Sequence, residues 1–231
     1  MKLSTLLVTA LVGLVSAGSS VANDDRRTWA FDVYLDDKAI GYHNFAVAEE
    51  GTRTVLETEA EFDVKFLFVT AFRYKHSNTE IWSDGCLDEL YATTDNNGEL
   101  LTVTGAEESK AFEVSSKRGE QTLDGCVRSF AYWNPAILEA DRLLNSQTGE
   151  YEDVDVQLEG EDLINVAGQE VSANRYRVSV SRGDIFLWYT KSDNTWVALD
   201  APAKGKRRIR YQATDISNLK TELTTLAGVR S

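Results

Sequence analysis

Apolar and polar residues alternate along most of the chain, a pattern typical of β-strands that bury one face and expose the other. The strongest example spans residues 56–68, where apolar or small side chains take one face. Glu57, Glu59, Glu61 and Asp63 take the opposite face. Residues 72–82 continue the alternation, so we expect a neighbouring strand there.

Turn signals divide the chain into hairpins. Asp36–Lys38 separates alternating segments at 29–35 and 40–48, and Asp95–Gly98 separates two further strands. More strands are predicted at residues 154–158, 164–166, 176–180, 185–189, 195–199 and 207–214. About ten strands in hairpin order indicate a large antiparallel sheet that curls to bury its apolar face.

One internal segment has helical signals. Asn134 is a favoured N-cap residue and Pro135 suits the first helical position, so we expect a helix from Pro135 to about Asn145. A second, short helix is expected at residues 218–226. The predicted fold is mainly β: a single large curled antiparallel sheet, like half a barrel, wrapped on the mid-chain helix, with a short C-terminal helix.

Residues 1–22 have the pattern of a secretory signal peptide. Lys2 supplies a positive charge, an apolar run of about 13 residues follows, and small residues precede the cleavage site. This run is shorter than the roughly 20 residues that a membrane-spanning helix needs. Cleavage after Ala22 is preferred, with cleavage after Ala17 as the alternative. We therefore expect a single β-rich domain, residues 23–231, that is located in the bacterial periplasm or secreted.

Cys86 and Cys126 are the only cysteines. Thiols of exported proteins enter an oxidising compartment and tend to pair, so we predict a disulfide between them. The alternative makes one of them a catalytic thiol beside His43 or His76. Neither cysteine lies in a recognisable nucleophile motif, which favours the disulfide.

The formal net charge is −13, and this sign disfavours a protein that follows nucleic-acid phosphates. A local basic cluster departs from this balance, formed by Lys204, Lys206, Arg207, Arg208 and Arg210. We interpret the cluster as charge that protects a solvated edge strand. The alternative is a patch that binds an anionic partner, such as a lipid headgroup or an acidic glycan.

The histidines do not form a metal-binding pattern. His43 and His76 lack both the helical spacing and the nearby third ligand that zinc sites show, so we expect no metal and no cofactor. Hydrogen bonds within the sheet are their expected role, and no catalytic residue is assigned. The enzymatic alternative is an envelope hydrolase in which His43 or His76 acts with Glu80.

Aromatic residues suggest a binding function. Most aromatics in strands form core, but a concave sheet that its helix fills incompletely would leave some of them lining an apolar cavity. The candidates for such a ligand cavity are Trp82, Tyr132, Trp133, Trp188, Trp196, His43 and His76.

Several segments resemble an uncharacterised family of exported bacterial proteins. The most distinctive is Ser129–Pro135, which reads SFAYWNP, followed by residues 143–150 with the pattern LLNxQTGE. The likeness covers nearly the whole mature chain and implies a domain of unknown function. The order of strands, helix and strands is also similar to the half-barrel of periplasmic lipoprotein carriers and their outer-membrane receptors, in architecture only.

These observations favour a non-enzymatic periplasmic binding or carrier protein for a hydrophobic or envelope-derived ligand. The expected partner is a hydrophobic small molecule or lipid, without nucleic acid and without an integral membrane segment after signal cleavage. The envelope hydrolase is one alternative. A structural or interaction protein that docks a partner through an edge strand is the other.

Overall fold

The computed structural model describes residues 26–66 and 69–219. Thirteen of its strands form one sheet, in the order β11-β12-β13-β14-β15-β1-β2-β3-β4-β5-β6-β7-β8, with every neighbouring pair antiparallel. The predicted signal peptide lies outside the described residues. Among those residues, no helix is long and apolar enough to cross a membrane.

The first eight strands are β1 (Arg27–Leu35), β2 (Lys38–Glu50), β3 (Arg53–Phe66), β4 (Val69–Ser83), β5 (Cys86–Asn96), β6 (Glu99–Glu108), β7 (Ala111–Ser116) and β8 (Gly119–Asp124). A two-stranded sheet of β9 (Arg142–Leu144) and β10 (Tyr151–Asp153) follows. The C-terminal half of the large sheet contains β11 (Asp155–Val166), β12 (Gln169–Val180), β13 (Gly183–Thr190), β14 (Trp196–Ala203) and β15 (Arg207–Ile216).

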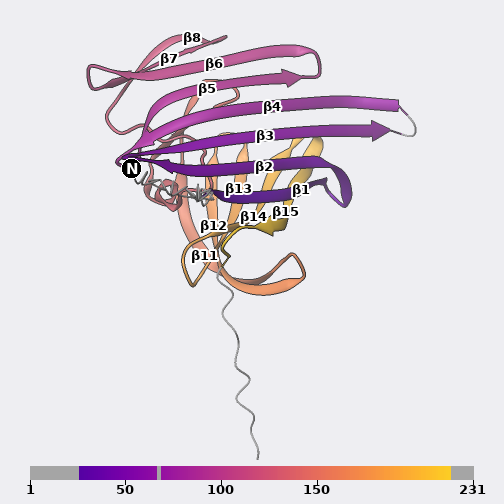
Figure 1. The fold of residues 1–231 in the computed structure, drawn as a ribbon. Helices are drawn as coiled ribbons and strands as arrows, with labels where there is room; N and C mark the ends of the chain where they lie inside the picture. Colours follow the sequence, from indigo (N-terminus) through magenta and orange to yellow (C-terminus); the bar gives the residue numbers. More distant parts are fainter. Residues whose placement is uncertain (1–25, 67–68, 220–231) are drawn as a thin grey trace, which may run out of the picture.

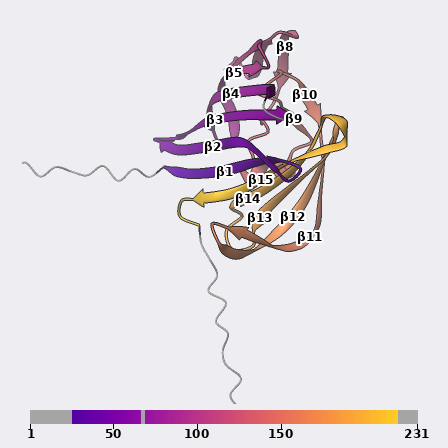
Figure 2. The same cartoon turned by 90° about the vertical axis from the view of Figure 1, so that its right-hand side faces the viewer.

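The predicted antiparallel sheet is confirmed. Hairpin connections build β1–β8 and β11–β15 separately, and pairing of β1 with β15 joins the two halves. Figure 1 shows β1 to β6 lying side by side, and β15 continues the sheet next to β1. Figure 2 shows the sheet as an arc from β8 to β11, which are its two edges.

Alternation of side chains gives the arc a dry inner face. Two apolar clusters lie inside it. The larger contains Trp29, Phe31 and Trp196, and the smaller contains Val33 and Phe62. Because successive residues of a strand point to opposite faces, the acidic residues of β3 lie on the outside.

The prediction of a mid-chain helix from Pro135 to about Asn145 is wrong. Residues 125–154, which we call the plug, link β8 to β11, and much of the segment is buried in the larger cluster. Asn134 does cap a helix, since its side chain accepts a hydrogen bond from the Ala136 amide. That helix is the 3₁₀ helix η1 (Pro135–Glu139), which ends after five residues.

Tertiary pairing ends the helix. Leu143 and Leu144 are fully buried, and β9 pairs with β10 across a turn at residues 145–149. This pairing buries two adjacent leucines at once, which a one-sided surface helix does not do. The sheet therefore encloses an irregular plug. The described residues contain no α-helix, only η1 and a second 3₁₀ helix, η2 (Lys204–Lys206).

The predicted C-terminal helix gains no support. Its first residue, Asn218, has a left-handed backbone with φ of 57° in a turn after β15. Residues from 220 onward lie outside the described part of the chain.

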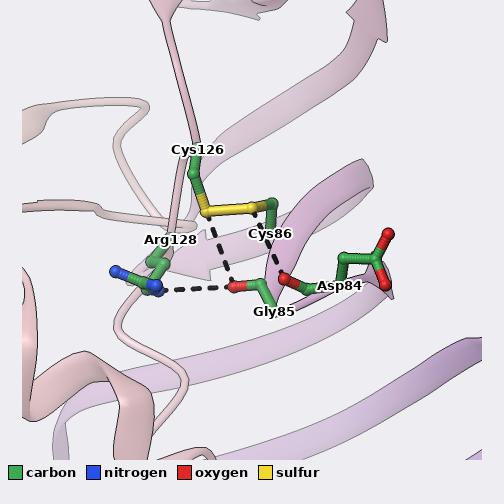
Figure 3. Close-up of a disulfide and its surroundings, with 5 residues drawn as sticks. All are labelled: Asp84, Gly85, Cys86, Cys126 and Arg128. Atoms are coloured by element: carbon green, nitrogen blue, oxygen red, sulfur yellow. Dashed lines mark hydrogen bonds between the residues drawn. A yellow bond between two sulfur atoms is a disulfide. The ribbon is translucent and has the colours of Figure 1, made fainter.

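The predicted disulfide is confirmed. Cys86 and Cys126 are bonded, with their Cα atoms 5.1 Å apart. Figure 3 shows the bond between the start of β5 and the start of the plug, with Arg128 donating a hydrogen bond to the Gly85 carbonyl at 3.3 Å. The Leu87 amide also donates to the Val127 carbonyl at 2.9 Å. The disulfide thus attaches one end of the plug to the sheet.

Gly41 marks a close approach between β2 and β3. Its φ is 153°, and a Cβ added there would lie 1.8 Å from the Glu61 carbonyl oxygen. The register of β1 and β2 also shifts beside it, between Val33 and Tyr34. Only glycine satisfies both the backbone angle and the space at this bulge.

We predict that Gly41→Ala lowers the free energy of unfolding by about 2–3 kcal/mol, because the new methyl group forces the two strands apart. Gly160→Ala is the matched control, since Gly160 has a φ of 158° with no atom near its added Cβ. Urea unfolding monitored by tryptophan fluorescence measures both variants. Equal losses in the two variants would show that the contact with Glu61 contributes nothing.

We also predict that replacing both cysteines by alanine lowers the free energy of unfolding by about 4 kcal/mol, because the crosslink closes a loop of 40 residues in the unfolded chain. Urea unfolding of the double variant and the oxidised parent measures the difference. Thiol quantification on the unreduced, denatured parent should give no free thiol. Superimposable unfolding curves would contradict the stabilising role.

Candidate functional site

A cavity of about 390 Å³ lies inside the arc, between the two apolar clusters. Its volume is within the range of small-molecule binding pockets. The plug contributes one wall through Phe130, Tyr132 and Gln147. The sheet contributes apolar side chains that include Phe45, Leu56, Phe62, Phe72, Ile185 and Leu199.

Strand register places the histidines in the same row of the inner face. His43 of β2 and His76 of β4 both lie opposite Ala60 of β3. Two strand spacings therefore separate them, which is about 10 Å. Both rings line the cavity.

Each histidine has a hydrogen-bond partner in the sheet. His43 Nδ1 lies 2.9 Å from the Tyr211 hydroxyl, and His76 Nδ1 lies 2.9 Å from the Thr94 hydroxyl. Burial lowers the pKa of His76 to about 4 and the pKa of His43 well below its ordinary value, with the His76 charge adding to the shift at His43. Both rings are consequently neutral at neutral pH.

Glu80 of β4 is a buried carboxyl group, 1% exposed, in the cavity wall. It accepts three hydrogen bonds of 2.9–3.0 Å, from Asn78, Trp82 and Ser129. Burial raises its pKa, and these three hydrogen bonds oppose the rise. Because Ser129 belongs to the plug, Glu80 fastens the plug to the middle of the sheet.

Three tyrosines line the cavity from three elements: Tyr74 of β4, Tyr132 of the plug and Tyr211 of β15. Burial raises the pKa of each hydroxyl above its ordinary value. The charge of an ionised Tyr132 adds to the rise in pKa of Tyr74 and Tyr211.

The cavity rim is polar. Arg182 forms an ion pair of 2.8 Å with Glu152, whose side chain is 3% exposed. Asn145 and Ser181 also donate hydrogen bonds to Glu152. Arg182 and Asn145 both border the cavity. The charge of the arginine is therefore balanced by a buried acid at the rim.

The predicted cavity residues divide into two groups. His43, His76 and Tyr132 do line the cavity, whereas Trp82, Trp133, Trp188 and Trp196 do not border it. Trp196 and Trp82 are buried in the larger cluster, and the Trp133 ring meets Trp82 edge to face at 5.9 Å. Trp188 lies on the opposite face, where its indole donates to Asp162.

Trp82 and Trp196 are core because rings of the plug pack against them. The plug packs against the half of the inner face that carries the largest rings, and large rings give the greatest apolar burial. Sequence reasoning missed Tyr74 and Tyr211, although both stand at inward positions of alternating strands. That alternation was the signal that could have found them.

The basic cluster is not on an edge strand. Arg207, Arg208 and Arg210 belong to β15, which lies between β14 and β1. They pair with Asp36, Asp200 and Asp37, respectively. Side chains from the β1–β2 turn and from β14 thus balance the arginines, and Lys204 and Lys206 lie in η2. Binding of an anionic partner at this cluster stays an untested prediction.

The hydrolase alternative lacks the required contact. Glu80 accepts from Asn78, Trp82 and Ser129, whereas the histidines contact Tyr211 and Thr94. No hydrogen bond joins Glu80 to either histidine in the described part of the chain. Within the same residues, no group of three or more histidine, cysteine or acidic side chains is arranged to hold a metal ion.

Comparisons with known proteins agree with this architecture. A solved structure, described as a beta-barrel-like protein of domain of unknown function DUF1849 from Brucella abortus, has a TM-score of 0.61 and 10% sequence identity. The likeness covers 84% of this chain and 98% of that chain, and at this identity it shows the fold alone. No curated protein matches the sequence.

The sequence itself matches a family model over residues 31–214, which includes the SFAYWNP segment and all the residues that line the cavity. The resemblance to a family of unknown function is thereby confirmed. The chain belongs to the family described as domain of unknown function DUF6134.

Proposed function

We propose that the protein is a non-enzymatic binding protein of the bacterial periplasm whose cavity holds a small, largely apolar ligand. The observation that carries this proposal is the cavity of about 390 Å³ inside the sheet. Its wall combines aromatic and aliphatic side chains with a few polar groups, which is the usual composition of a ligand pocket. The signal-peptide pattern at residues 1–22 supports the location.

The electrostatics of the cavity favour an apolar occupant. Both histidines are neutral, and Glu152 balances Arg182 at the rim. Glu80 is enclosed and already accepts three hydrogen bonds. A charged ligand would lose its hydration without meeting an unpaired opposite charge, whereas an apolar ligand gains free energy from burial.

The cavity wall also contains buried polar atoms without protein partners. His43 Nε2 and Asn78 Oδ1 make no hydrogen bond among the described residues. An unsatisfied buried polar atom costs about 1–3 kcal/mol. Because these unpaired atoms lower the stability of the protein, their presence in the wall supports a role in binding a ligand.

We predict that N-phenyl-1-naphthylamine, an apolar fluorescent probe, gains fluorescence on binding the purified protein. Ala201 lines the cavity, so Ala201→Trp should fill it and reduce probe affinity by about tenfold or more. Ala48→Trp, on the outer face of β2, should leave affinity unchanged. Fluorescence titration measures all three proteins, with circular dichroism to verify folding.

Absence of binding to the parent would overturn the proposal, as would unchanged affinity in a folded Ala201→Trp variant. Native mass spectrometry of protein purified from a bacterial periplasm, followed by solvent extraction, then identifies any natural ligand. A bound apolar molecule would support the proposal directly.

Acid should destabilise the protein through its buried neutral histidines. The pKa of His76 is about 4 in the folded protein and about 6.5 when solvated, so the unfolded chain binds the extra proton between these values. The free energy of unfolding therefore keeps its full value above about pH 6.5 with respect to His76. It falls by about 3 kcal/mol as the pH decreases to about 4. Urea unfolding at several pH values measures this slope.

His76→Gln removes one titrating group and should reduce the loss of stability in that pH range. A variant with the same slope as the parent would show that His76 is not held neutral by burial.

A further inference from the structure

We propose that the cavity selects an uncharged apolar molecule that carries a carbonyl oxygen, and that the hydroxyls of Tyr74 and Tyr132 donate hydrogen bonds to that oxygen. This inference rests on the proposed binding function and names the class of ligand. It begins from the three tyrosines that line the cavity.

The fold brings these tyrosines together from distant parts of the chain. Tyr211 lies opposite Val33, and Tyr74 lies opposite Phe62. Gly41 pairs with both Val33 and Phe62, so Tyr211 and Tyr74 belong to one row across the inner face. Curling of the sheet turns both ends of this row toward the same cavity.

The plug brings the third ring to the same place. The Tyr132 ring contacts the Trp196 ring at 5.4 Å between centroids, and Trp196 contacts Tyr211 at 6.3 Å. The Tyr132 carbonyl also accepts a hydrogen bond of 2.7 Å from Tyr189. Its backbone and its ring are therefore both fixed by the core, which preorganises the hydroxyl.

Two of the three hydroxyls are available to a ligand. Tyr211 is engaged with His43 Nδ1, whereas the hydroxyls of Tyr74 and Tyr132 have no hydrogen-bond partner among the described residues. Glu80 and Arg182 are committed to other groups of the protein, whereas His43 Nε2 and Asn78 Oδ1 are not. Tyr74 and Tyr132 therefore each bring a free hydroxyl donor to the cavity.

The chemistry of two neutral donors defines the acceptor. A carbonyl oxygen has two lone pairs and can accept from both hydroxyls while the rest of the ligand contacts the aromatic wall. A carboxylate would bring a charge that no unpaired cation of the cavity wall balances. An alkane would leave both hydroxyls without a partner.

The test compares four ligands of equal chain length: nonane, nonyl alcohol, methyl heptyl ketone and nonanoate. Each is titrated against N-phenyl-1-naphthylamine bound to the full mature protein at neutral pH. We expect the ketone to displace the probe at the lowest concentration, and nonanoate to require at least about ten times more. Nonane should displace the probe at an intermediate concentration.

Variants locate the interaction. Tyr74→Phe and Tyr132→Phe should each weaken ketone binding about fivefold and leave nonane binding unchanged, since each removes only a hydroxyl. Tyr91→Phe is the matched control because Tyr91 is 58% exposed outside the cavity. Circular dichroism verifies that each variant is folded.

Four outcomes overturn the inference: nonanoate or the alcohol binding more tightly than the ketone, nonane matching the ketone, or ketone affinity unchanged in both phenylalanine variants. In each of these cases the probe and at least one nine-carbon ligand still bind, so the proposed binding function stands. Failure of the probe and of every ligand to bind would instead overturn the binding function itself.

Discussion

Pairing of β1 with β15 is the constraint on which the remaining structure depends. Seven register pairs, from Trp29 opposite Ile216 to Leu35 opposite Ile209, join the beginning of the described chain to its end. Without them, the hairpins of each half would form two separate sheets, each with an uncovered apolar face. The joined sheet is long enough to curl around the plug, and its curvature brings Tyr74 and Tyr211 to one cavity.

The cavity exists because the plug covers only part of the inner face. Where Leu143, Leu144 and Ile137 fill the interior, the tryptophans of the sheet become ordinary core. Beyond the plug, the rows that contain His43, His76 and Tyr74 face unfilled space. Glu80 borders the cavity and accepts a hydrogen bond from Ser129, so it links the sheet to the plug at the cavity wall.

The strands were predictable because alternation is local information. The apolar side of β3 and the turn at Asp95–Gly98 require only neighbouring residues, and the structure places both where the pattern indicates. The plug was not predictable in the same way. Asn134 and Pro135 do begin a helix, but pairing of β9 with β10 decides its length, and that pairing depends on the surrounding sheet.

The sequence predicted the type of candidate site, an aromatic cavity, but only some of the residues that line it. The number of strands predicted a concave sheet, and an aromatic cavity was predicted only on the condition that the helix fills this sheet incompletely. Which aromatics would face the space depended on the path of the plug, so Tyr132 was identified while Trp196 proved to be core. The disulfide needed only the compartment argument and two cysteines.

The plug also connects the two open edges of the sheet, since it leaves β8 and enters β11. It therefore acts as an internal tether. We expect a motion that separates these edges to pull on the segment that forms one wall of the cavity. The separation of the two edges and the volume of the cavity would then change together.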